Sequence, residues 1–251
     1  MCSILIADDE LIIVKQLFND IIERNQNIKL IGITNNGKEV LNWMENNKPD
    51  ILLLDLMMPK MNGIEVLDKL IEQKDKYLTK TKIIIISSYL EQLYDSDKYR
   101  NYIYATLPKP YNIDKLMELI NAVDSEIRDN DIDICIQKEL EKFNFNRDTE
   151  AYKYLKETIH EIIYKNNDKF KLEGEIYNKV AIMNKKSTIQ IKWTIEKMMD
   201  SMYINTRYDI IKEYFNFKEY KKPTTKNFIK NVVENINDQR ADLVRQKHEI
   251  K

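Results

Sequence analysis

Acidic residues follow two of the short apolar runs in the first half of the chain. Asp8, Asp9 and Glu10 follow the first run, and Asp55 follows a later one. Parallel strands bring their carboxyl ends to the same edge of a sheet, so we expect these carboxylates to converge. Hard oxygen ligands in a small open cluster suit Mg²⁺, which needs only one or two carboxylates and keeps several waters. The sequence therefore predicts a magnesium site formed by Asp8, Asp9 and Asp55.

A hydroxyl and an ammonium group are expected at the same edge. Ser87 ends a later apolar run, and Lys109 ends the last one. A carboxylate, a metal ion, a cation and a hydroxyl together can receive a phosphoryl group and stabilise its charge. Taken singly, the two aspartates after the first run could cap a helix, Ser87 could be an ordinary strand-end hydroxyl, and Lys109 a surface charge. Asp55 is harder to explain in this way, because a carboxylate directly after four apolar strand residues is costly without a partner.

Strand and helix patterns alternate through the first half of the chain. Strands are expected at 3–7, 29–33, 51–54, 83–86 and within 102–107, and helices at about 11–25, 38–47, 64–73 and from 113. The strand runs are apolar throughout, which is typical of strands covered on both faces. Five successive strand–helix units predict right-handed crossovers and an α/β fold with a doubly wound, five-stranded parallel sheet.

The strand pattern stops after about residue 124. The polar stretch at 125–131 is the best break in the chain, so we expect a domain at 1–124, a linker at 125–131 and a second domain at 132–251. The second domain should be all-helical, and its charged end at 238–251 should form either an extended helix or a frayed tail. Its helices are expected at about 132–143, 150–165, 175–183, 188–203, 208–215 and 225–236.

The composition favours a folded protein of the cytoplasm. The chain has 251 residues, 43% of them hydrophobic and 32% charged, which is enough for one or two folded domains. Its two cysteines fit neither a disulfide framework nor a zinc ribbon, which favours a reducing compartment. No run approaches 18 apolar residues, so we expect neither a signal peptide nor a membrane span, and no membrane partner.

A capping box in the second half indicates the start of a helix. The Ser187 hydroxyl can accept from the amide of Gln190 while the Gln190 side chain reaches back. A short helix and a polar turn at 184–186 come before it. Helix, short turn and capped helix together favour a helix-turn-helix, although this spacing alone is a weak signal because any helical bundle contains such pairs. The expected core stripe of the second helix is Ile191, Ile195, Met198, Met199 and Met202.

The motifs of the first half, taken together, resemble those of a known family. Asp8-Asp9, Asp55-Leu56-Met57-Met58-Pro59, Asn62-Gly63, Ser87 and Lys109-Pro110 resemble the motif set of the receiver domain of bacterial two-component response regulators, over about residues 1–125. The resemblance implies that Asp55 is the phosphoacceptor and Asp9 the principal Mg²⁺ ligand, with Asp8 acting nearby or through water. It also implies that the carbonyl of Met57 is a third ligand.

The same resemblance assigns the remaining residues of the site. Ser87 would bind a phosphoryl oxygen and Lys109 would pair with the phosphoryl group, aimed inward by a cis peptide before Pro110. One position departs from the family. Receivers commonly carry an aromatic residue three positions before this lysine, but this chain has Thr106 there, with Tyr104 nearby. The departure leaves the phosphorylation chemistry intact and puts in doubt the route by which phosphorylation is transmitted.

The second half resembles the C-terminal effector domain of the sporulation-initiation regulators of endospore-forming bacteria. The similarity runs from about 132 to 237, through Tyr152-Lys153-Tyr154-Leu155-Lys156-Glu157-Thr158-Ile159, Ile176-Tyr177-Asn178-Lys179-Val180-Ala181, Ser187-Thr188 and Lys222-Pro223-Thr224-Thr225-Lys226-Asn227-Phe228-Ile229. It implies an all-helical domain that binds DNA as a homodimer after phosphorylation. The second motif helix would then enter the major groove.

The expected recognition face departs from these relatives, in which it is rich in arginine. The candidate DNA-contacting residues are Lys185, Lys186, Ser187, Gln190, Lys192, Trp193, Glu196 and Lys197. The lysines can hold phosphates, Gln190 can pair with adenine, and Glu196 can accept only from cytosine. Trp193 has two interpretations: contact with sugar or a thymine methyl group, or a partly buried place in the core.

These features predict a response regulator phosphorylated on Asp55 by a sensor histidine kinase or phosphorelay protein, with Mg²⁺ as cofactor. It would control transcription by sequence-specific binding of double-stranded DNA. The alternative is a phosphorylation-controlled regulator that acts by protein–protein interaction and no longer reads DNA. A phosphohydrolase with Asp55 as nucleophile is a further alternative, and Met57 counts against it because an acid is expected at that position.

Overall fold

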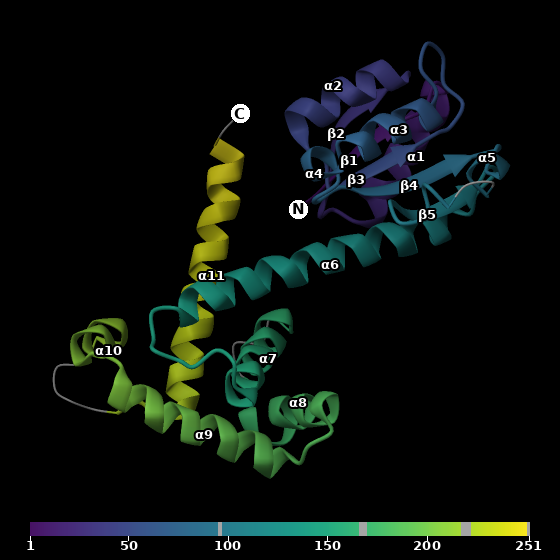
Figure 1. The fold of residues 1–251 in the computed structure, drawn as a ribbon. Helices are drawn as coiled ribbons and strands as arrows, with labels where there is room; N and C mark the ends of the chain where they lie inside the picture. Colours follow the sequence, from purple (N-terminus) through teal and green to yellow (C-terminus); the bar gives the residue numbers. More distant parts are fainter. Residues whose placement is uncertain (95–96, 166–169, 217–221, 250–251) are drawn as a thin grey trace. The chain divides into compact units, whose positions relative to one another are not determined.

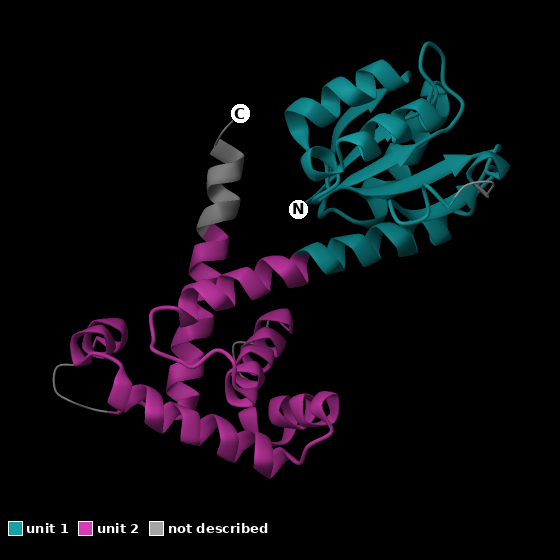
Figure 2. Ribbon diagram, viewed as in Figure 1, with its two compact units in different colours: residues 1–127 teal, residues 128–251 magenta. Residues whose placement is uncertain are grey.

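The computed structural model describes residues 1–94, 97–165, 170–216 and 222–249. The chain divides into two compact units, residues 1–127 and 128–251, coloured separately in Figure 2. Each unit has its own hydrophobic core, so each is described by itself. Within the described residues, no helix is long and apolar enough to cross a membrane.

Unit 1 is built on a five-stranded, fully parallel sheet with the strand order β2-β1-β3-β4-β5 (Figure 1). The strands are β1 (Cys2–Ala7), β2 (Ile28–Thr34), β3 (Ile51–Leu54), β4 (Lys82–Ser87) and β5 (Ile103–Pro108). The expected doubly wound sheet is confirmed. Because β1 and β3 are neighbours in the sheet, the residues that follow them leave the same edge side by side.

Helices cover both faces of this sheet. They are α1 (Leu11–Arg24), α2 (Gly37–Asn47), α3 (Gly63–Glu72), α4 (Lys74–Tyr77), α5 (Glu91–Tyr94) and the first part of α6 (Ile113–Leu140). Alternate strand residues point to opposite faces, so Leu52 and Leu54 pack with α2 and α3, whereas Ile51 and Leu53 pack with α1 and α6. Between β4 and β5, where the sequence predicted no helix, the described residues form the short α5.

The helix α6 runs without a break through the expected linker. The sequence predicted two helices separated at 125–131, but the structure has one helix of 28 residues. The polar stretch contains neither glycine nor proline. It therefore has no residue that removes a backbone hydrogen bond or strongly disfavours the helical conformation. The boundary between the units, at 127/128, lies within this helical stretch.

The regular elements of unit 2 are all helices over its described residues. Its elements are the second part of α6, α7 (Glu150–Tyr164), the π-type turn η1 (Leu172–Ile176), α8 (Tyr177–Asn184), α9 (Thr188–Asn205), α10 (Tyr208–Phe215) and α11 (Thr225–Glu249). The last helix runs beyond 236 as far as Glu249, so the charged end forms the extended helix, one of the two expected forms, over its described residues. Aromatic side chains pack together in the core: Phe143, Phe145 and Phe215 contact the fully buried Phe228, and Tyr214 packs against Phe143 and Phe215.

The helix pair α8–α9 has the local features that the sequence predicts. Ser187 and Gln190 form both halves of the capping box at the start of α9. Lys185 ends α8 in the left-handed conformation, with φ of 54°, which turns the chain sharply between the two helices. The expected stripe on α9 faces the core, since Ile191, Ile195, Met199 and Met202 are buried and Met198 is partly buried.

Candidate functional site

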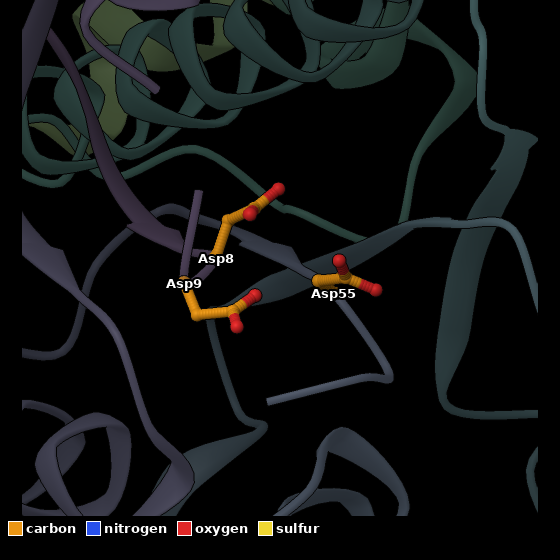
Figure 3. A group of neighbouring side chains, drawn as sticks. All are labelled: Asp8, Asp9 and Asp55. Carbon is orange, nitrogen blue, oxygen red and sulfur yellow. The ribbon is translucent and has the colours of Figure 1, made fainter. Parts of the chain in front are cut away.

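Three carboxylates meet where β1 and β3 end. The amide of Asp55 donates to the carbonyl of Ala7 at 2.8 Å, which holds the residue after β3 beside the end of β1. One oxygen atom from each of Asp8, Asp9 and Asp55 can be chosen so that all three lie within 4.8 Å of one another (Figure 3). Asp8 and Asp55 are buried, and Asp9 is exposed.

Lys109 joins two of these carboxylates. Its Nζ lies 2.6 Å from Asp8 Oδ2 and 2.6 Å from Asp55 Oδ2. The backbone of Lys109 is held by β4, because its amide donates to the carbonyl of Ser87 at 3.1 Å. Burial opposes the positive charge, but the hydrogen bonds that Lys109 donates to Asp55 and Asp8, together with the negative charges of these carboxylates, raise the pKa of Lys109 to about 12. Lys109 therefore stays a cation at physiological pH.

Backbone amides orient the second oxygen of each buried carboxylate. The amide of Met57 donates to Asp55 Oδ1 at 3.1 Å, and the amide of Glu10 donates to Asp8 Oδ1 at 2.9 Å. The Glu10 carboxylate also lies 3.8 Å from Lys109 Nζ. Glu10 was not assigned a role from the sequence, although its place directly after the two aspartates was the signal for one.

Gly63 makes room for the backbone that carries Asp55. A Cβ atom at this position would lie 2.3 Å from the carbonyl oxygen of Asp55 and 2.7 Å from the Cα of Leu56, closer than real Cβ contacts allow. Asn62 and Glu65 close the neighbouring capping box and fix the start of α3. The Asn62-Gly63 motif therefore lets the start of α3 approach the backbone of Asp55 and Leu56 closely.

The other expected residues of this site, on β4 and β5, differ in their burial. Ser87 is fully buried at the end of β4, and its hydroxyl accepts from the amide of Tyr89 at 3.4 Å. The peptide between Lys109 and Pro110 is cis, as expected. Thr106 is partly buried on β5, while Tyr104 on the same strand is exposed.

This arrangement fits a magnesium ion and a phosphoryl group. Its metal-binding groups are all oxygen atoms: the carboxylates of Asp8, Asp9 and Asp55, with the Met57 carbonyl close to them in sequence. A divalent cation would reduce the repulsion among the three carboxylates, and Lys109 supplies a second positive charge. Groups of this kind stabilise the charge of a transferring phosphoryl group.

In unit 2, several of the expected DNA-contacting groups already have partners. Gln190 Oε1 accepts from the amide of Ser187 at 2.9 Å, and the Ser187 hydroxyl accepts from the amide of Gln190 at 3.2 Å. Lys186 lies 3.6 Å from Glu150, and Lys192 lies 2.5 Å from Glu173.

The hydrogen bond to Glu173 also raises the pKa of Lys192. Glu173 was not among the expected site residues, because nothing in the sequence places it beside α9.

Trp193 lies on the surface of α9, with 61% of its area exposed, which excludes the core interpretation. The ammonium group of Lys197 lies 5.0 Å from the centre of its ring, a cation–π contact. Glu196, in the next turn, and Lys185, in the preceding loop, are also exposed. All eight expected residues therefore lie on α9 or in the turn before it, seven of them exposed and Lys192 partly buried, and together they carry both signs of charge.

Comparison with known families gives two matches along the chain. Residues 4–121 match the response regulator receiver domain, and residues 136–236 match the sporulation initiation factor Spo0A C-terminal domain. The first match covers the carboxylate site, and the second covers the helix-turn-helix.

Similar proteins match part of the chain. The transcriptional regulatory protein YdfI of Bacillus subtilis is 37% identical over 91 residues, which are 36% of this chain and 40% of that protein. A protein-glutamate methylesterase/protein-glutamine glutaminase of Clostridium acetobutylicum is 42% identical over 65 residues, 26% of this chain and 19% of that protein. The chain thus spans two fifths or less of the length of these relatives. The receiver domain of Francisella response regulator 1452 is 26% identical, with a TM-score of 0.43, and the match covers 51% of this chain and 99% of that domain.

Proposed function

The chain belongs to the response regulators that join a receiver domain to a Spo0A C-terminal domain, and we propose that phosphorylation of Asp55 controls its binding to DNA. The observation that carries the proposal is the convergence of Asp8, Asp9, Asp55 and Lys109 at one edge of the sheet. The receiver implies a histidine kinase or phosphotransfer protein as partner, and the second domain implies DNA. The activity of the whole chain would then be a switch and not a metabolic reaction.

In the proposed phosphorylation, each group of the site has its own role. An oxygen of Asp55 forms a bond to phosphorus while the bond from phosphorus to the donor's histidine nitrogen breaks. Asp8, Asp9 and the Met57 carbonyl would hold Mg²⁺, which supplies charge stabilisation at the transferring group. Lys109 now bonds to Asp8 and to Asp55, so it can turn to the phosphoryl oxygens without leaving the site. Ser87 would hold another phosphoryl oxygen.

The proposed readout is transcription through unit 2. The helix α9 would enter the major groove, and the phosphorylated chain would bind DNA as a homodimer. We propose residues 1–124 as receiver, 125–131 as the connecting segment and 132–251 as effector. Action on chromosomal DNA would place the protein in the cytoplasm.

A direct test is the mass change on treatment with acetyl phosphate and Mg²⁺. The wild-type chain should gain one phosphoryl group, and the Asp55→Asn variant should gain none. Asp75→Asn is a matched control, because it removes an exposed carboxylate of the same unit and should leave labelling intact. Continued labelling of Asp55→Asn would contradict the assignment.

A second candidate function is regulation through a protein partner, without sequence-specific DNA binding. It is favoured by the mixed charge of the α9 surface, where Glu196 would repel phosphates. Selection of a random duplex library at physiological salt separates the two, because charge-driven binding dominates only at low salt. An enriched motif supports the transcriptional function, and sequence-blind binding supports the protein partner.

An enzymatic role of Asp55 is a separate alternative. A phosphohydrolase with Asp55 as nucleophile would need a general acid, and Met57 occupies the position two residues later where one is expected. Turnover of a small phosphoester tests this alternative, and we expect none.

A further inference from the structure

The outward face of α9 carries large apolar side chains that the core does not use. Ile189 is 79% exposed and Trp193 is 61% exposed. They lie four residues apart in the first half of the helix, so they occupy the same face, one turn after the other. The buried side of the helix is formed by Ile191 and Ile195. Burial in unit 2 therefore does not explain Ile189 and Trp193.

The polar groups that usually read base edges are scarce on this face. The sequence of α9 contains no arginine, so only its two lysines, Lys192 and Lys197, have a side chain of the kind that contacts guanine. The side-chain oxygen Oε1 of Gln190 accepts from the backbone amide of Ser187 in the capping box, and the ammonium group of Lys192 pairs with the carboxylate of Glu173. Lys197 is free to turn outward from its place over Trp193. What remains uncommitted at the start of α9 is mainly apolar.

Granting the DNA binding proposed above, we propose that Ile189 and Trp193 select A·T base pairs by contact with thymine methyl groups in the major groove. The C5-methyl group of thymine is the apolar feature among the base edges of that groove. Residues at the start of a recognition helix are the ones that reach base edges. Contact with a methyl group would bury apolar surface that water now covers, and this burial is favourable.

The charges around these two residues fit the major groove as the occupant. Lys185 and Lys186 lie in the turn just before α9, and Lys197 lies one turn after Trp193, next to the exposed carboxylate of Glu196, which is the one opposing charge beside this face among the described residues of α9 up to Lys197. Cations at both ends of an apolar centre match a groove with methyl groups on its floor and phosphates along its two rims. Further along, Asp200 pairs with Lys222, so the negative charge of the second half of the helix is met within the protein.

The test begins with the full-length chain treated with acetyl phosphate and Mg²⁺, which selects a preferred site from a random duplex library at physiological salt. Each thymine of that site is then replaced by deoxyuridine, which lacks only the methyl group. We expect affinity to fall about fourfold at one or two thymines, as the loss of one buried methyl group implies. The Ile189→Ala and Trp193→Ala variants should each bind the selected duplex more weakly. Each should also bind equally well with thymine or deoxyuridine at the one position of the site that its missing side chain contacts.

Ile204→Ala is the matched control. Ile204 is also an exposed isoleucine of α9, with 84% of its area accessible, but it lies 15 residues after Ile189, about 22 Å along the helix. Its replacement should leave both affinity and the response to deoxyuridine unchanged. Helical circular dichroism of all three variants checks that the fold is kept.

The outcomes separate this proposal from the function on which it rests. An enriched site whose affinity ignores the methyl groups and both alanine variants overturns the methyl contact but leaves sequence-specific DNA binding in place. The absence of any enriched site, with salt-sensitive and sequence-blind binding, overturns both and favours a protein partner on this face. A thymine-rich site that loses affinity with deoxyuridine only when Ile189 and Trp193 are present supports the proposal.

Discussion

The two units hold their charged groups in different ways. In unit 1, the carboxylates of Asp8 and Asp55 are 7% and 6% exposed, and Lys109 bonds to both. In unit 2, the charged candidates on α9 lie at the surface, and Lys192 bonds to Glu173 outside the expected set. Buried charges must find partners among themselves, whereas exposed charges can pair with any neighbour or with water.

This difference decides how far residue type reveals chemistry. Where carboxylates and a lysine are enclosed together, their types alone point to cation and phosphoryl binding. On an exposed helix, only the structure tells which groups remain available.

Replacing Lys109 by methionine should destabilise unit 1 strongly in the absence of Mg²⁺. Removing one partner of a buried ion pair leaves the carboxylates of Asp8 and Asp55 without compensation, which costs about 3–5 kcal/mol. The chain has two tryptophans, Trp43 in unit 1 and Trp193 in unit 2, so Trp43 fluorescence in a Trp193→Phe background reports urea unfolding of unit 1. A change below about 1 kcal/mol would mean that the site tolerates uncompensated charge.

A buried charge in unit 2 should behave as those of unit 1 do. Glu139 is 1% exposed and accepts from Lys142, Tyr214, Asn235 and Gln239. Burial opposes its charge, but the hydrogen bonds from Lys142, Tyr214 and Gln239 lower its pKa.

A carboxyl group with a lowered native pKa stabilises the fold above its unfolded pKa, and this contribution is lost as the pH falls through the native pKa. Glu139→Gln should therefore cost about 2 kcal/mol at neutral pH and progressively less in acid. Urea unfolding followed by circular dichroism across this pH range measures the difference. An equal difference at neutral and acid pH would contradict the role of the ionised carboxylate.

The N-cap serine of α9, Ser187, should contribute more to stability than Ser201, the serine within the helix. Ser187→Ala removes the acceptor for the amide of Gln190 and should cost about 1 kcal/mol of stability. Ser201→Ala makes the same substitution in the interior of α9 and serves as the control. Thermal unfolding of the two variants should differ, and equal melting temperatures would show that the cap contributes nothing.

The smallest effect is expected from freeing a surface lysine. Glu173→Gln removes the partner of Lys192 and should change stability by less than about 1 kcal/mol, because exposed ion pairs contribute little. If the freed ammonium then contacts a phosphate, the dependence of log affinity on log salt should steepen by about 1. An unchanged slope would place Lys192 away from the DNA backbone.

Much of unit 1 could be predicted from the sequence. Its apolar runs and helical periodicities reproduce the five strands and the positions of α1, α2 and α3, and the strand ends bring Asp8, Asp9 and Asp55 together. The contact between Gly63 and the carbonyl of Asp55 could not be derived, because it depends on the path of a loop between two elements.

The rest of the fold and of the expected DNA-binding surface could be predicted only in part, for physical reasons. Polar residues at 125–131 suggested a break, but polarity without glycine or proline does not end a helix, so α6 continues through them. In unit 2 the capping box and the core stripe of α9 were predicted, whereas the surface position of Trp193 was left open. The partner of Lys192 depends on Glu173, which is distant in sequence, and no local pattern reveals it.

We propose that phosphorylation of Asp55 controls the affinity of unit 2 for DNA. The most direct test is the affinity of the full-length chain for its selected duplex before and after treatment with acetyl phosphate and Mg²⁺, in the wild type and in Asp55→Asn. We predict an increase of about 5- to 150-fold in the wild type, the usual range for coupled sites, and none in the variant. Equal affinities of the phosphorylated and unphosphorylated wild type would contradict the account.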